Sequence, residues 1–223
     1  MSPDGTRVNF SSNHNGTWNL YSKAASGVGE VEVLLESRFD QFPSGVTADG
    51  RLVYQEIHES TGVDIWILPI GGEPEPWLVT PDEEAAAQPS PSGELMAYMT
   101  NVSGRFEISI QDIDRVFDPL RISTNGGTHP IWSSSGERLY FRQGHQFMVS
   151  DISTEPVLTA SVPNIIFGGG WELSHQAQPL FSDFGVMSDE RFLMIRHPPE
   201  SVPTRGNVIF NWFKELRERV PVP

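Results

Sequence analysis

The chain repeats a turn-and-strand pattern at nearly constant spacing, and this regularity limits what it can fold into. At four places an Asp-Gly or Ser-Gly pair is followed by an apolar run. The turn glycines are Gly5, Gly50, Gly93 and Gly136, so the steps between them are 45, 43 and 43 residues. A fifth, degraded copy has Ser188, Asp189 and Glu190 before the apolar run at residues 191–195. Five related units in one chain predict a repeat architecture.

A second feature follows each turn at a fixed distance. Leu20, Ile65 and Ile108 each lie 15 residues after a turn glycine, and each follows Asn, Asp or Glu. Glycine permits the positive φ of a tight turn, and the flanking runs are rich in β-branched and aromatic residues. Each repeat therefore predicts four antiparallel strands. One such sheet cannot bury both of its faces alone, so neighbouring sheets must stack.

The order of these features resembles the TolB-type or WD40-like (PD40) β-propeller repeat. Residues 128–136 (THPIWSSSG) are similar to the first half of that repeat, and residues 64–73 (DIWILPIGGE) to the second. The resemblance covers nearly the whole chain and implies an all-β fold, a β-propeller of four to five four-stranded blades. The C-terminal part is similar to the end of propellers that are attached to bacterial serine/threonine kinases or transcriptional regulators.

We expect a single domain over residues 1–223, with blades at approximately 1–38, 39–80, 85–124, 128–162 and 180–213. A short helix is expected over residues 213–220, because Leu216 and Val220 are spaced i,i+4 among charged residues. The first repeat begins at its turn, so its first strand is missing and the ring is expected to be incomplete. Met1 is then an internal residue, or a gene start, within a longer parent. The alternatives are a genuine small propeller and a ring completed by another copy.

Charge and cysteine content narrow the partners. The formal net charge of -14 disfavours phosphate backbones and anionic membranes, and no apolar run is long enough for a membrane helix. Absence of cysteine excludes disulfides and thiolate metal sites. We therefore expect a soluble domain with no cofactor, no nucleic acid partner and no membrane insertion, which can self-associate through open propeller edges. Its compartment is periplasmic or extracytoplasmic within a longer TolB-like or receptor-kinase parent, and otherwise cytoplasmic.

The search for catalytic motifs favours a protein that is not an enzyme. The chain has no G-x-S-x-G nucleophile motif, and its six histidines form no H-x-x-x-H pair. Trp171 and His175 belong to a Gly-rich, irregular insertion, where binding residues tend to lie, and they are candidate ligand or partner contacts. His129, on a presumed inner strand, is a third candidate; its alternative interpretations are a channel metal ligand and a hydrogen-bonding strand end. Asp82, Glu83 and Glu84 lack calcium-loop spacing, so no metal is expected there and the segment is interpreted as a solvated loop.

The sequence thus predicts a non-catalytic scaffold for protein–protein or ligand binding, the sensor or interaction part of a larger bacterial signalling or envelope protein. The alternative is the accessory or gating propeller of a hydrolase such as a serine peptidase, or a propeller lyase that uses a channel metal. A third hypothesis is a fragment with no independent function.

Overall fold

The computed structural model describes residues 1–168, 182 and 184–194, and in them the chain folds entirely into β-strands and loops. The first sheet contains β1 (Arg7–Ser12), β2 (Asn19–Ala24) and β3 (Glu32–Leu35). The second contains β4 (Asp40–Val46), β5 (Leu52–His58), β6 (Gly62–Leu68) and β7 (Glu75–Leu78). The third contains β8 (Glu84–Pro89), β9 (Leu95–Thr100), β10 (Glu107–Asp112) and β11 (Leu120–Arg121).

The fourth sheet has the same order with one addition. It contains β12 (Thr128–Trp132), β13 (Arg138–Gln143), β14 (Gln146–Ser153) and β15 (Thr159–Ala160), and β16 (Asn164–Gly168) also pairs with β14. The fifth repeat contributes the hairpin of β17 (Phe184–Val186) and β18 (Phe192–Met194). All strand pairs are antiparallel, and all of them join strands that are neighbours in sequence except the pair of β14 and β16.

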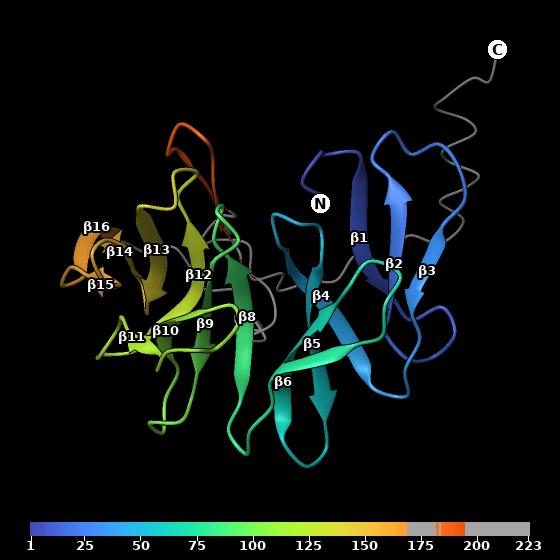
Figure 1. Cartoon of the computed structure of the whole chain (residues 1–223), viewed down its shortest axis with the longest axis horizontal. Coiled ribbons are helices and arrows are strands. Elements are labelled where there is room, and N and C mark those ends of the chain that lie inside the picture. The colour runs from blue at the N-terminus through green and yellow to red at the C-terminus, as the bar shows by residue number, and fades with distance from the viewer. Residues whose placement is uncertain (169–181, 183, 195–223) are drawn as a thin grey trace, which may run out of the picture.

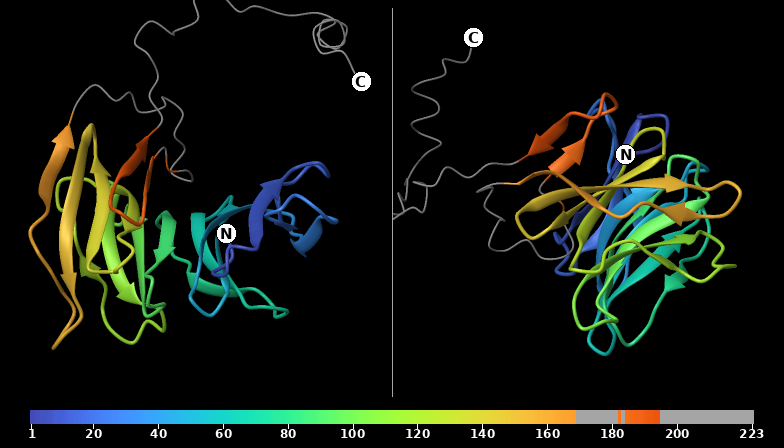
Figure 2. Two further views of the ribbon diagram at one scale, coloured as in Figure 1. Left: turned by 90° about the horizontal axis from the view of Figure 1, so that it is seen from above. Right: turned by 90° about the vertical axis from the view of Figure 1, so that its left-hand side faces the viewer.

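The sheets stand side by side around an axis, as the blades of a propeller do (Figures 1 and 2). The first strands of successive blades, β4, β8 and β12, contact one another on the inside of the arc. Each blade covers one face of the next, which explains why side chains on both faces of the strands are buried. The fold is therefore an all-β propeller, as the sequence predicted.

The five turns repeat one hydrogen-bond pattern. The N–H groups of residues Ser2, Thr47, Ser90, Ser133 and Met187 donate across the turn to the carbonyls of Arg7, Arg51, Leu95, Arg138 and Arg191 at 2.8 to 2.9 Å. The same five residues accept from the N–H of the turn glycine or, in the fifth repeat, of Glu190. Glu190 has a φ of +62°, so the degraded copy keeps the left-handed turn without its glycine. Asp4, Asp49 and Asp189 bond hydroxyl, N–H or guanidinium groups of their own turns, so they act as turn formers.

The inner strands share an irregularity. The pairing register shifts after Pro43 in β4, after Ala85 in β8 and after Thr128 in β12. Ala86 and His129, each seven residues before its turn glycine, have left-handed φ angles of 52° and 53°. An extra residue of this kind bends the strand, so the bulge shapes the inner wall of the second, third and fourth blades.

The core lies between the blades. The Nε1 of Trp132 donates to the carbonyl of Gln88 on the preceding blade at 2.9 Å, so this tryptophan joins two blades. Phe147 of β14 packs edge-to-face on Phe184 and Phe192, with centroids 4.9 and 6.0 Å apart, and attaches the fifth repeat to the fourth blade. Among the described residues the short hairpin has no strand pairing with the fourth blade, and these aromatic contacts hold it there instead.

The two ends of the arc are incomplete among the described residues. The first sheet has no inner strand, so β1 is its edge, as the sequence predicted. The expected helix at residues 213–220 lies outside the described residues. Within residues 1–168, 182 and 184–194, no helix is long and apolar enough to cross a membrane.

Candidate functional site

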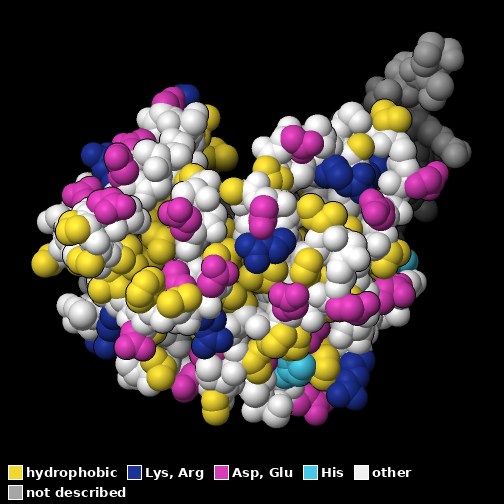
Figure 3. Space-filling model, in the orientation of Figure 1, with side chains coloured by type: hydrophobic (Ala, Val, Ile, Leu, Met, Phe, Trp, Pro, Cys, Tyr) yellow, Lys and Arg dark blue, Asp and Glu magenta, His cyan; other side chains and the backbone are white. Residues whose placement is uncertain are grey.

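A cavity of about 400 Å³ opens on the propeller axis, and we call it the axial mouth. It is lined by the same part of every repeat, the end of the inner strand and the turn after it. The lining residues are Met1, Pro3 and residues 46–48, 88–91, 131–134 and 186–188. Figure 3 shows the molecule hollowed at the edge where the β4–β5 turn and the β17–β18 hairpin face each other.

The chemistry of the axial mouth differs from that of the rest of the surface. Acidic side chains are scattered over the face shown in Figure 3, and the chain carries a net charge of -14. The described side chains that line the mouth are hydroxyls, prolines, apolar groups and one amide, and none of them is ionisable. Such side chains offer hydrogen bonds and apolar contact.

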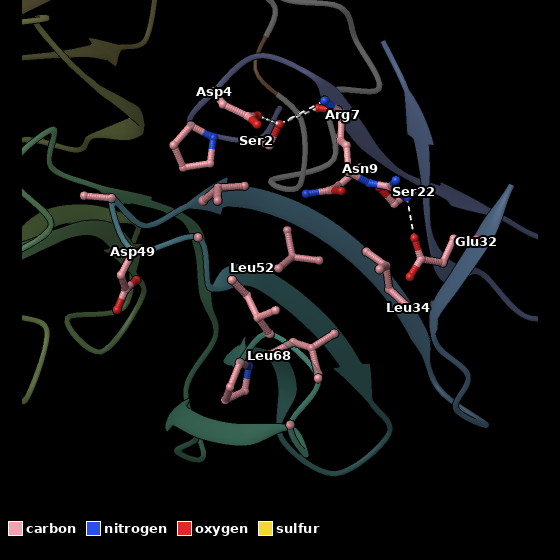
Figure 4. Close-up of a pocket in the computed structure, with 18 of the residues that line it drawn as sticks. Ser2, Asp4, Arg7, Asn9, Ser22, Glu32, Leu34, Asp49, Leu52 and Leu68 are labelled. Atoms are coloured by element: carbon pink, nitrogen blue, oxygen red, sulfur yellow. Dashed lines mark hydrogen bonds and ion pairs between the residues drawn. The ribbon is translucent and has the colours of Figure 1, made fainter. Parts of the chain in front are cut away.

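A second cavity, which we call the inter-blade cleft, lies between the first and second blades and has a volume of about 680 Å³. Figure 4 shows Leu34, Leu52 and Leu68 at its floor, while Asp4, Arg7 and Glu32 stand at its rim. The Arg7 guanidinium pairs with the Glu32 carboxylate, and its Nε donates to the Ser22 hydroxyl at 2.9 Å. Pro3, Val46 and Ala48 line both cavities, so the inter-blade cleft and the axial mouth adjoin.

The structure places only one of the three predicted site residues. His129 is buried in β12, at the end of the inner strand that is remote from the axial mouth, and it lines neither cavity. Trp171 and His175 lie outside the described residues, so they remain predictions. The sequence analysis did not find the inter-blade cleft, because its residues come from two blades and none of them forms a motif.

A set of buried carboxylates was also missed. Glu84, interpreted as part of a solvated loop, is instead the first residue of β8 and is buried against the second blade. Its Oε1 accepts from the Thr80 hydroxyl at 2.7 Å, while Oε2 is buried without a hydrogen-bond partner. Burial raises the pKa of Glu84 to about 7, and the nearby carboxylates of Asp64 and Asp82 add to this shift. The interpretation was wrong because adjacent charges in a sequence do not reveal which of them begins a strand.

The acidic residue that precedes Ile65 in the second blade and Ile108 in the third blade has opposite environments in these two blades. Asp64 in β6 and Glu107 in β10 both lie 14 residues after their turn glycine. Burial raises the pKa of Asp64, against the hydrogen bond from the Thr61 hydroxyl. Burial also disfavours the Glu107 carboxylate, but its hydrogen bonds, those from Ser123 and Arg105 above all, outweigh this and lower its pKa. Neither residue lines a cavity, so both act within the blades.

Possible metal ligands can be compared only within the part of the chain that the structure describes. In that part, no three His, Asp or Glu side chains are grouped closely enough to hold a metal ion. Asp64 and Glu84 are buried near each other between the second and third blades, and neither residue lines a cavity.

Comparisons with known proteins show the fold. No family model matches the chain. No curated protein matches it either. Among solved structures, TolB from Agrobacterium tumefaciens is similar with a TM-score of 0.61 and 20% identity, over 76% of this chain and 65% of that one. TolB from Acinetobacter baumannii has a TM-score of 0.56 and 22% identity, over 74% of this chain and 42% of that one. An oligogalacturonate lyase in complex with manganese has a TM-score of 0.56 and 12% identity, over 91% and 71%.

The chain therefore covers less than two thirds of the length of both TolB structures. At these identities the likeness concerns the path of the backbone and not the side chains of a site. Together with the sheet order and the repeated turns, it establishes the β-propeller fold of the described residues.

Proposed function

We propose that this chain is a non-catalytic binding propeller of the TolB type that receives an uncharged segment of a partner protein at the axial mouth. One observation carries the proposal: residues at equivalent positions of all five repeats converge on the axial mouth, and none of their side chains is ionisable. The likeness to two TolB structures supports a binding scaffold.

The chemistry of the axial mouth selects among partners. The net charge of -14 repels acidic segments at long range, and a mouth without acidic side chains offers no ion pair to a basic one. The exposed Ser134 and Ser188 hydroxyls and the Gln88 amide can bond the backbone of an extended peptide. The exposed Pro3 and Pro91 supply apolar contact. The proposed occupant is therefore an extended segment that is rich in small polar and apolar residues.

Site-specific photo-cross-linking in cells tests the proposal. A photoreactive phenylalanine analogue at Pro91 or Ser134, both exposed and lining the axial mouth alone, should cross-link one specific protein. The same analogue at Val116, which is exposed far from the mouth, should not. Equal cross-linking at all three positions, or none at the mouth positions, would contradict the assignment.

A charge placed in the mouth gives a second test. Ser134→Glu adds a carboxylate to a surface that has none, and we expect it to weaken partner binding at least tenfold, because the charge must be desolvated against an uncharged segment. Val116→Glu adds the same charge outside the mouth and should leave affinity unchanged. Unchanged affinity in Ser134→Glu would place the contact elsewhere.

A hydrolase or lyase propeller is the second candidate function. It rests on the backbone likeness to a lyase in complex with manganese and on His129, the predicted site residue that the structure places, although this imidazole is buried and lines neither cavity. Purified chain is incubated with Mn²⁺ and oligogalacturonate, or with peptide and ester substrates. Turnover that His129→Gln abolishes would replace the binding proposal with an enzymatic one.

The same proposal has three further parts. They are self-association through the open edge of β1, a periplasmic location within a longer TolB-like parent, and a role in a signalling or envelope protein. Light scattering tests the first of these, because pairing between edges makes the mass depend on concentration. A mass that stays monomeric at every concentration would remove self-association and leave the axial mouth unaffected.

A further inference from the structure

The first two blades have the same outer-strand geometry with different residues in it. In the first blade, β2 pairs with β3 through Leu20 with Leu35 and Tyr21 with Val33, and the register skips Leu34. In the second blade, β6 pairs with β7 through Ile65 with Leu78 and Trp66 with Pro76, and the register skips Trp77. Leu20 and Ile65 both lie 15 residues after their turn glycine, so Leu34 is the counterpart of Trp77.

Trp77 fills the outer part of the interface between the second and third blades. It is 4% exposed, and its indole Nε1 donates to the carbonyl of Ile113 at 2.7 Å. Its ring packs edge-to-face on Tyr98 at 5.4 Å, and the guanidinium of Arg115 lies over it at 5.9 Å from the centroid. An aromatic ring with an N–H donor, covered by a cation, is thus what this kind of interface accommodates.

The interface between the first and second blades lacks both groups. Leu34 takes the place of Trp77, and a step of 43 residues back along the repeat places Gly72 at the position of Arg115 and Ile70 at that of Ile113. Ile113 is 9% exposed beneath its tryptophan, whereas Ile70 is 78% exposed. The inter-blade cleft of about 680 Å³ is lined by Leu34, Ile70 and Gly72, so it is the space that an indole and a guanidinium occupy one interface further along.

The rim of the inter-blade cleft is acidic. Asp4, Glu32 and Asp49 line it. Glu32 is paired with the Arg7 guanidinium, and Asp49 with the Arg51 guanidinium at 2.9 Å. Hydrogen bonds from the Ser2 hydroxyl and from Thr6 lower the pKa of Asp4 to about 2. Asp4 is therefore ionised at neutral pH, and an added cation is favoured beside it.

We infer that the inter-blade cleft binds a small aromatic amine. The ring lies against Leu34, Leu52 and the exposed Ile70. A ring N–H donor faces the Ile70 carbonyl as the indole of Trp77 faces that of Ile113, and the ammonium lies at the acidic rim near Asp4. Asp4 and the apolar floor then recognise charge and ring separately. This site is distinct from the axial mouth in chemistry, although the two adjoin at Pro3, Val46 and Ala48.

Tryptamine is the probe, and indole-3-acetate is its matched anion. Titration of the purified chain is followed by NMR chemical shifts, and a probe of this size should bind with a dissociation constant on the order of a millimolar or tighter. Tryptamine should bind at least tenfold more tightly than indole-3-acetate, because only the former complements the rim. Equal affinities, or no saturable shift with tryptamine, would overturn the inference.

Leu34→Trp fills the inter-blade cleft from within. We expect tryptamine affinity to fall at least tenfold in this variant, while Val28→Trp, which adds the same side chain at a position 75% exposed and outside the cleft, leaves it unchanged. Leu34→Phe gives the same test with a smaller ring, should the tryptophan prevent folding. Asp4→Asn should weaken tryptamine binding severalfold and leave the binding of neutral indole unaffected. Tryptamine binding that survives both Leu34 variants would place the probe elsewhere.

Discussion

The interface between the second and third blades and the interface between the first and second share one backbone geometry, yet one is filled and the other is open. In the filled interface Trp77 is bonded to Ile113 and covered by Arg115. In the open interface the counterparts Leu34 and Gly72 line a cleft of about 680 Å³. The difference teaches that the repeat fixes where strands lie, whereas single side chains decide whether a gap between blades becomes core or stays open as a cleft.

Removing the tryptophan should make the filled interface resemble the open one. Trp77→Ala deletes a buried indole and its hydrogen bond to the Ile113 carbonyl, so we expect a loss of about 4 kcal/mol in the free energy of unfolding. Urea unfolding monitored by circular dichroism measures it. The control is Trp18→Ala, because Trp18 is 37% exposed and should cost about 1 kcal/mol. Equal losses in the two variants would mean that the filled interface does not depend on its indole.

The filled interface also contains a buried acid that should weaken it at high pH. The pKa of Glu84 is raised to about 7 in the folded chain from an ordinary value of 4.5, so the folded state holds a proton that the unfolded state releases between these pH values. Stability from this group is complete below pH 4.5 and is lost as the pH rises through 7. Glu84→Gln cannot ionise, and at pH 8 we expect it to exceed the parent chain by roughly 3 kcal/mol.

The pH dependence of the difference between variant and parent is the measurement. Glu107→Gln is its counterpart, because the hydrogen bonds from Ser123 and Arg105 hold the pKa of Glu107 below its ordinary value. That group stabilises the fold above its unfolded pKa and loses this contribution as the pH falls, so Glu107→Gln should be the less stable chain at neutral pH. If Glu84→Gln is also less stable than the parent at pH 8, the buried-acid account of the filled interface is wrong.

Filling the open interface should produce a smaller gain. Leu34→Trp places an indole where the neighbouring interface has one, and we expect stabilisation by about 1 to 2 kcal/mol from the added buried apolar surface. Val28→Trp, on an exposed loop, should change stability by less than about 0.5 kcal/mol. A loss of stability in Leu34→Trp would show that the two interfaces are less alike than their strand registers indicate.

The sequence alone predicted the blades because turn glycines and strand patterns recur at fixed steps, and local chemistry dictates both. Gly50 and Gly93 have the positive φ that their turns require, and even Glu190 was placed correctly as a degraded turn. The inter-blade cleft could not be found in this way, since Leu34 and Ile70 meet only after two blades have packed. Aligning the fourth strands of the repeats would have paired Leu34 with Trp77, and that substitution is the one signal the sequence contains.

The end of the arc offers the smallest and most finely balanced test. Glu190 takes a left-handed conformation that costs a non-glycine residue about 1 kcal/mol, but its Oε2 also pairs with Arg138 Nη1 at 2.7 Å. Both side chains are about half exposed, so the pair contributes at most a few tenths of a kcal/mol after screening by solvent. Glu190→Gly should therefore stabilise the β17–β18 hairpin by about 0.5 kcal/mol, whereas Glu190→Gln, which loses the pair and keeps the strain, should destabilise it slightly. Amide hydrogen exchange of Phe192 and Leu193 reports both changes locally, and faster exchange in Glu190→Gly than in the parent chain would mean that the ion pair, and not backbone strain, governs this end of the propeller.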